Sequence, residues 1–262
     1  MAEQQQNTGA TPPTGERVPP VPSLLQKHMG DTATELCQTE DARVRKVRRL
    51  FDQFPPGSKI LDVGCCDGWI LSTLAGKHDV HGVDIGEELV RRAKENGLKA
   101  QVHDVATAPL PYKDGEFDVV FSGETIEHQV DTDWFLSELN RVLKPGGTLV
   151  LTLPNVRTLV SIGMMIFMGL PPKFSARYRA SHFRDFTLKV GKIAIENHGF
   201  EILKITGSDI HLPVFGYTLS PVAALFPSWA ETIIYLAVKR ARSEYAMCSA
   251  DESDIYGLSR KK

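Results

Sequence analysis

The chain has 262 residues, of which 42% are hydrophobic and 24% charged, values typical of a globular protein with a packed core. Its formal net charge is −2, so the chain as a whole offers no attraction to a phosphate polymer, and nucleic acid gains no support as a substrate. The four cysteines show the spacing of neither a zinc site nor a disulfide framework, which favours a reducing compartment. We therefore expect a cytoplasmic protein.

The two ends of the chain differ in composition from its body. Residues 1–22 are rich in Gln and Pro and contain no apolar core, so they predict a disordered arm rather than a secretory signal. Residues 243–262 are polar and predict a loose tail. A single domain is expected between them, over residues 23–242. The longest apolar run, 159–170, is too short to span a bilayer.

The body alternates aliphatic and amphipathic stretches. Residues 42–51 predict a covering helix, because apolar Val44, Val47 and Leu50 fall on one side of an otherwise basic segment. Strands are then predicted at 58–65, 78–85, 99–105, 115–122 and 148–155, with helices at 87–97 and 133–147, the second ended by Pro145 to Gly147. Such alternation predicts an α/β fold, a doubly wound sheet with helices on both faces. Ligands of such sheets bind at the carboxyl ends of the strands.

The end of the first strand reads ILDVGCCDGW, residues 60–69. Gly64 and Gly68 allow a tight turn and the close approach of a ligand to backbone N–H groups. A dinucleotide fingerprint would require glycine at positions 64, 66 and 69, but the last two are Cys66 and Trp69. The bulk of Trp69 argues against a nicotinamide dinucleotide.

Acidic residues stand at three successive strand ends, at Asp62, Asp84 and Asp104. Asp84 is suited to hydrogen-bond ribose hydroxyls, and Asp104 can accept a hydrogen bond from an adenine amine. Each carboxylate taken singly is more often a turn residue or a helix cap. Three of them at neighbouring strand ends indicate a nucleoside site.

Four stretches resemble, in order, the motifs of class I S-adenosylmethionine-dependent methyltransferases, in particular type 11-like enzymes such as small-molecule and ubiquinone-type O-methyltransferases. They read ILDVGCCDGWILSTLA, VHGVDIGEELVRRA, HDVATAPLPYKDGEFDVVFSGETIEH and VLKPGGTLVLTLPN. The resemblance is close over 58–155 and looser to residue 240. It implies a Rossmann-like seven-stranded sheet whose last strand is antiparallel, and S-adenosyl-L-methionine as cofactor.

The resemblance also implies cofactor contacts. The methionine part of the cofactor would lie against Asp62, Gly64, Cys65 and Gly68. The remaining contacts would be Asp84 and Ile85 for ribose and adenine, Asp104 and Val105 for adenine, and Ser122 in the loop beneath the sulfonium. The sequence departs from the family at Cys66, where glycine is usual.

The segment after the fourth strand narrows the choice of methyl acceptor. SGETIEH, residues 122–128, stands where methyltransferases of nucleic-acid amines carry an Asn/Asp-Pro-Pro-aromatic turn, and no Pro-Cys pair is present for pyrimidine carbon methylation. A hydroxyl of a small molecule, lipid-linked precursor or glycan is therefore favoured. Such a hydroxyl needs a base, or a metal that lowers its pKa.

Three interpretations of Glu124, Glu127 and His128 stay open. If a helix began near Glu124, the three side chains would share one face at i, i+3 and i+4. They could then be a helix start with a loop-orienting histidine, or His128 could be a general base held by Glu127. In the third interpretation, Glu124, Glu127, His128 and the distant His182 bind a divalent metal, as in the metal-dependent relatives that this spacing resembles; Mn, Fe, Co or Zn would suit such ligands.

Two poorly patterned segments are expected to determine the acceptor. Residues 156–183 predict a lid over the acceptor. One half of this segment is basic, and the other is apolar and could contact a membrane surface. The second segment, residues 211–229, is also apolar. Two alternatives remain. One is a metal-assisted RNA ribose 2′-O-methyltransferase; the other is a non-catalytic, cofactor-binding scaffold whose partner docks on 156–183.

Overall fold

The computed structural model describes residues 40–170, 182–212 and 217–243. The predicted arm, 1–22, lies outside these ranges, as do all but the first residue of the predicted tail, 243–262, and residues 171–181 of the predicted lid. The boundaries expected for the single domain therefore stay predictions.

Seven strands form one sheet in the order β3-β2-β1-β4-β5-β9-β6. Strand β9 runs antiparallel to both of its neighbours, while the pairs on the other side of β5 are parallel. The predicted Rossmann-like sheet with one antiparallel strand is confirmed. The strands are β1 (Lys59–Val63), β2 (Asp79–Asp84), β3 (Lys99–Val102), β4 (Phe117–Gly123), β5 (Leu143–Pro154), β6 (Phe200–Gly207) and β9 (Thr232–Lys239).

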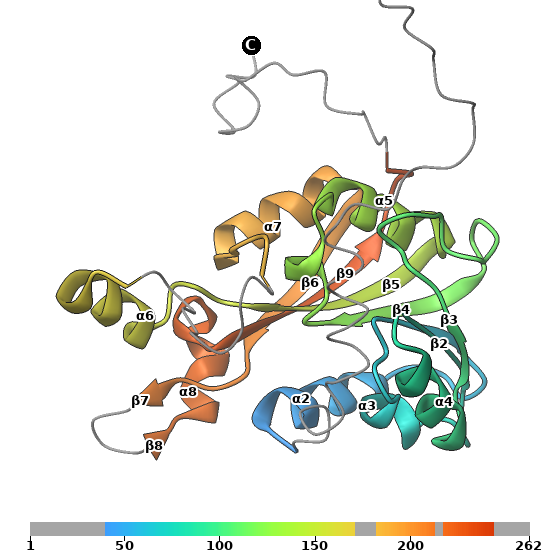
Figure 1. The fold of residues 1–262 in the computed structure, drawn as a ribbon, viewed down its shortest axis with the longest axis horizontal. Helices are drawn as coiled ribbons and strands as arrows, with labels where there is room; N and C mark the ends of the chain where they lie inside the picture. The colour runs from blue at the N-terminus through green and yellow to red at the C-terminus, as the bar shows by residue number, and fades with distance from the viewer. Residues whose placement is uncertain (1–39, 171–181, 213–216, 244–262) are drawn as a thin grey trace, which may run out of the picture.

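Helices cover both faces of the sheet (Figure 1). On one face lie α2 (Ala42–Phe51), α3 (Trp69–Ser72) and α4 (Glu87–Glu95), and on the other α5 (Thr132–Val142) and α7 (Leu188–Asn197). Each layer buries its own apolar cluster. The first includes Val47 and Phe51 of α2 against Ile60, and the second includes Phe135 and Leu139 of α5. The apolar residues of the alternating strands and helices are thus buried on both faces of the sheet.

Helix ends follow local side-chain chemistry. Asp41 caps α2 by accepting a hydrogen bond from the Val44 N–H (2.8 Å), and Asp131 caps α5 through the Trp134 N–H (2.8 Å). The predicted end of α5 at Gly147 is wrong. The helix stops at Val142 because Leu143 already pairs with Phe117 of β4, and the Pro145–Gly147 turn belongs to β5.

A group of short elements extends beyond the carboxyl ends of the parallel strands, at the left of Figure 1. It comprises α6 (Leu159–Gly163), the π-helical turn η2 (Met164–Met168), the hairpin of β7 (His211–Leu212) and β8 (Tyr217–Thr218), α8 (Ser220–Leu225) and η3 (Pro227–Trp229). These elements come from the two segments that the sequence assigns to acceptor selection. Within the described ranges, no helix is both long and apolar enough to cross a bilayer.

The packing of α7 against the sheet can be tested at Gly191, where the helix lies close to β5 and β9. A Cβ atom there would lie 2.6 Å from the Tyr235 hydroxyl and 2.7 Å from Leu153 Cδ1. We expect Gly191→Ala to lower the free energy of unfolding by about 1–3 kcal/mol through overpacking, although alanine is otherwise the better helix former. Urea denaturation measures the change.

Gly163→Ala is the matched control, because Gly163 has helical dihedral angles and no atom lies within 4 Å of the added Cβ. This variant should be as stable as the natural chain or up to about 1 kcal/mol more stable. Equal stability of the two variants would contradict the packing of α7 described above.

Candidate functional site

Two acidic side chains approach each other at the carboxyl ends of β1 and β2. Asp62 is buried in β1, and its pKa is raised well above the ordinary value, mainly by burial and further by the negative charge of Asp84; Arg43 acts in the opposite direction. Asp62 Oδ1 makes no hydrogen bond with any part of the chain that the structure describes. A buried oxygen that accepts no hydrogen bond from the described residues is suited to a ligand that brings positive charge or an N–H group.

The glycine loop is held tightly against β4. Gly64 has φ +79°, and a Cβ atom there would lie 2.3 Å from Thr125 Oγ1, so only glycine fits. Ser122 is fully buried beneath the loop and donates to the Val63 carbonyl oxygen (3.0 Å). Gly68 also has positive φ, +73°, and precedes α3. The glycines thus shape the loop in the way that the sequence predicts.

Cys66 adopts the left-handed conformation that glycine usually supplies, with φ +51°. Its N–H donates to Asp84 Oδ2 (2.8 Å), and the Gly86 N–H donates to Asp84 Oδ1 (2.9 Å). Asp84 therefore supports the loop from β2. The side chain of Cys65 lies in the hydrophobic cluster beneath, where burial raises the pKa of its thiol, so only its backbone can face a ligand.

The residues expected to surround adenine lie at the ends of β2 and β3. Asp104 Oδ1 accepts a hydrogen bond from the Ala106 N–H (2.9 Å), which holds the turn after β3. Val105 is buried, and its carbonyl oxygen accepts from Trp134 Nε1 of α5 (2.9 Å), while Ile85 is half-buried after β2. These contacts show how the turns are held; binding of adenine there stays a prediction.

The stretch after β4 folds differently from the predicted helix. Glu124 has φ +52° and accepts at Oε1 from Thr152 Oγ1 (3.3 Å), and only the short 3₁₀ turn η1 (Ile126–His128) comes after it. No helix begins at Glu124, so the predicted common face at i, i+3 and i+4 is wrong. A left-handed residue at position 124 turns its side chain away from the direction that a helix would impose.

Glu127, His128 and His182 are brought together. Glu127 is 1% exposed, and its Oε1 lies 3.9 Å from Nε2 of His128, whose side chain is 31% exposed. The rings of His128 and His182 meet edge to face, with centroids 4.9 Å apart. One possible ligand atom from each of the three residues lies within 4.8 Å of the others. Glu124, the remaining predicted metal ligand, is not part of this group.

Backbone hydrogen bonds fasten the segment after the insertion to η1. The N–H groups of Phe183 and Arg184 both donate to the Glu127 carbonyl oxygen, at 2.8 and 3.2 Å. Asn155 forms a β-bridge with Phe186, which links the same segment to the end of β5. His182, distant in sequence, is placed beside His128 by these contacts.

Arg43 was not predicted as a site residue. It lies on α2, which the sequence indicates only as a covering helix, yet its Nη1 lies 3.5 Å from the Cβ position of Gly123 at the end of β4. Its positive charge also lowers the pKa of Asp62. One basic residue in a basic helix carries no distinguishing signal, so sequence alone could not find it.

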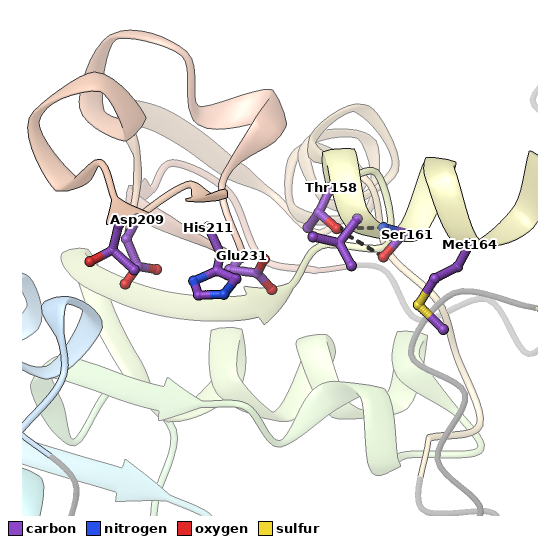
Figure 2. A pocket seen from close by; sticks show the side chains of 8 residues that line it. Thr158, Ser161, Met164, Asp209, His211 and Glu231 are labelled. Carbon is purple, nitrogen blue, oxygen red and sulfur yellow. Dashed lines mark hydrogen bonds between the residues drawn. The ribbon is translucent and has the colours of Figure 1, made fainter. Parts of the chain in front are cut away.

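A cavity of about 360 Å³ opens beyond the end of β5 (Figure 2). Thr158, which caps α6, lies on one side of it with Ser161 of α6 and Met164 of η2, and polar side chains lie on the other. The remaining lining residues are Val160, Asp209, His211, Thr218 and Glu231. Both segments that the sequence assigns to acceptor selection thus contribute to one cavity.

Comparison with known proteins accounts for this architecture. Residues 61–151 match the family model of a methyltransferase domain. Residues 61–151 therefore carry a methyltransferase domain. The matched residues run from β1 through β5, and therefore include the glycine loop, the acidic strand ends and the η1 turn.

Its relatives methylate different atoms. The chain is 35% identical over 134 residues to 27-O-demethylrifamycin SV methyltransferase of Amycolatopsis mediterranei, a match that covers 47% of this chain and 49% of that protein. It is 32% identical over 149 residues to dimethylglycine N-methyltransferase of Parasynechococcus marenigrum, covering 53% of each. The chain thus spans about half the length of these relatives.

A solved structure supports the fold. A SAM-dependent methyltransferase of Thermotoga maritima, described as a possible histamine N-methyltransferase, superimposes with a TM-score of 0.61. The match covers 76% of this chain and 88% of that one at 20% identity, which shows a common fold and no more.

The cofactor contact predicted for Asp62 can be tested. We expect Asp62→Asn to weaken S-adenosylhomocysteine binding at least about tenfold, or about 1.4 kcal/mol, because a charged partner for the cofactor's ammonium is lost. Because the folded-state pKa of Asp62 lies above its unfolded value, the ligand-free natural chain should lose stability as pH rises through that pKa. The variant should lack this loss. Calorimetric titration and urea denaturation at several pH values measure both effects.

Asp118→Asn serves as the control at the opposite end of β4. Its carboxylate accepts from the Lys59 N–H (2.9 Å) and from Lys144 Nζ (2.6 Å), so this variant should lose stability and keep its affinity for S-adenosylhomocysteine. Unchanged affinity in Asp62→Asn would contradict the assigned role of Asp62.

Proposed function

We propose that the protein transfers a methyl group from S-adenosylmethionine to a hydroxyl of a small-molecule, lipid-linked or glycan acceptor. The observation that carries the proposal is the placement of His128, partly exposed, beside the buried carboxylate of Glu127, directly after β4. The resemblance to class I methyltransferases implies that the reacting sulfonium lies near the end of that strand. Its relatives include enzymes named for oxygen and for nitrogen chemistry, so the choice of a hydroxyl rests on the histidine–carboxylate pair.

The chemistry assigns a proton-transfer role to this pair. S-adenosylmethionine supplies an electrophilic methyl group when bound. As the acceptor oxygen forms its bond to that carbon and the carbon–sulfur bond breaks, the hydroxyl proton must leave, and His128 is placed to take it. The buried negative charge of Glu127 stabilises the imidazolium that results. Since Glu127 is only 1% exposed, its charge is little screened by solvent.

The acceptor is proposed to extend toward the cavity beyond β5. This cavity combines apolar side chains, Val160 and Met164, with polar ones, and such a lining suits an amphiphilic molecule rather than a purely ionic one. Segments 156–183 and 211–229 both contribute to it, so changes in these segments should alter acceptor choice more than cofactor affinity.

A second candidate is metal-assisted methylation of a diol or of an RNA ribose 2′-hydroxyl. It is favoured by the clustering of Glu127, His128 and His182, whose three possible ligand atoms lie within 4.8 Å of one another. Metal–ligand bonds of about 2.0–2.2 Å require a somewhat tighter group, which small side-chain rotations could reach. A metal there would lower the acceptor pKa in place of a base. The net charge of −2 disfavours RNA.

Removal of the proposed base tests the function. With phenols, sugar alcohols and a polyprenyl phenol as acceptors, we expect His128→Ala to lower methyl transfer about 10²- to 10⁴-fold because proton removal is lost. Affinity for S-adenosylhomocysteine should stay within a factor of two. Transfer of radioactive methyl measures the first quantity, and calorimetry the second. Cofactor binding without turnover on any acceptor would instead support a non-catalytic scaffold.

The metal is tested separately by titrating Mn²⁺ into the protein saturated with S-adenosylhomocysteine. If the second candidate holds, binding is expected in the micromolar range, and Glu127→Gln and His182→Ala should each abolish it. Glu124→Gln should leave it intact, because Glu124 lies outside the group of three. Absence of binding to the natural chain would remove the metal and leave His128 as the base.

A further inference from the structure

The surface of the protein carries an unusual apolar feature at the turn η2. Met165, Ile166, Phe167 and Met168 are consecutive, and their side chains are 53%, 68%, 87% and 65% exposed. We call these four residues the apolar tip. Single exposed apolar residues are common on protein surfaces, whereas four in a row at the end of a projecting helix are not.

The direction of these side chains limits what can cover them. Successive residues of a helical turn point roughly 80–100° apart, so four in a row sweep most of the circumference. A helix that docks in a groove, or on another helix, presents one stripe and keeps its opposite face polar. A tip that is apolar nearly all round suits a medium that surrounds it, such as the hydrocarbon boundary of a lipid bilayer.

The end of the tip is consistent with shallow insertion. Gly169 adopts the left-handed conformation, φ +64°, and its N–H donates to the Met164 carbonyl oxygen, so the helix stops directly after Met168. The apolar segment is therefore one turn long, enough to reach the region below lipid headgroups and too short to span a bilayer.

A second apolar group lies at the same end of the molecule, on α8 and η3 (Figure 1). Leu225 and Phe226 are 77% and 59% exposed, and Trp229 is partly exposed. The guanidinium of Arg157, just before α6, lies 5.8 Å from the centre of the Trp229 ring. Trp and Arg side by side are typical of the headgroup level of a membrane, where the ring is half-buried and the cation meets phosphate.

The segment that carries the tip contains basic residues and no acidic ones. Between Glu138 and Asp185 the sequence contains no acidic residue, and this interval includes the exposed Arg157 and Arg184. Asp209 and Glu231 line the cavity beside Met164, so Arg157, which lies against Trp229, is the basic group at this end that can meet an anionic headgroup. Basic residues near a bilayer that contains anionic lipid each contribute about 1 kcal/mol of attraction.

We propose that the apolar tip, together with Leu225, Phe226 and Arg157 at the same end of the molecule, docks the protein on an anionic lipid surface. The carboxyl ends of the strands would then face the bilayer, because α6 and α8 extend beyond those ends. This docking does not depend on methyl transfer, and it can be measured in the absence of any acceptor.

Vesicle flotation with the full chain tests the proposal. The natural chain should bind vesicles of phosphatidylcholine with 30% phosphatidylglycerol and bind pure phosphatidylcholine several-fold less. The double variant Ile166→Ser/Phe167→Ser should lower the partition coefficient at least tenfold, and Arg157→Gln should lower it several-fold on the anionic vesicles only. Leu203→Ser is the control, since Leu203 is also an exposed apolar residue (54%) but lies on β6.

Affinity for S-adenosylhomocysteine, expected to be unchanged, shows that each variant is folded. The proposal is overturned if the natural chain binds neither vesicle, or if the double variant binds as well as the natural chain. Self-association without vesicles that depends on the tip would overturn it in favour of a dimer contact.

Discussion

The burial of one carboxyl group beside a second one, at one edge of the sheet, is the constraint on which the site depends. Asp62 and Asp84 end neighbouring parallel strands, and Asp62 is fully buried with one oxygen that makes no hydrogen bond to the described residues. A buried, poorly compensated acid costs stability in the ligand-free protein. We expect that cost to be recovered when a cationic ligand binds, so that the feature that weakens the ligand-free fold favours a cationic cofactor.

Backbone strain is concentrated at the same edge. Among the described residues, Cys66 and Glu124 are the two residues other than glycine with positive φ, and they flank the expected cofactor position from β1 and β4. A residue with a side chain costs about 1–2 kcal/mol in this conformation. Hydrogen bonds hold both: the Cys66 N–H donates to Asp84, and the Glu124 N–H donates to the Thr152 carbonyl oxygen. The central sheet thereby fixes two turns that their own sequences would not favour.

Most of the fold could be predicted from the sequence, because strands and helices alternate with clear aliphatic runs and glycine turns. The end of α5 could not, since the pairing of Leu143 with Phe117 is a tertiary contact that overrides the expected stop at Pro145–Gly147. Acidic strand ends and the glycine loop were found because parallel strands place their carboxyl ends together. The orientation of Glu124 was missed because it depends on one left-handed residue, and Arg43 because its reach depends on how α2 packs.

The central claim is that this edge of the sheet holds S-adenosylmethionine and not a nicotinamide dinucleotide. The most direct measurement is calorimetric titration of the natural chain with S-adenosylmethionine and, separately, with NAD⁺. We predict one site per chain for S-adenosylmethionine, with a dissociation constant in the micromolar range, and no heat of binding for NAD⁺. Binding of NAD⁺, or of neither compound, would contradict this claim.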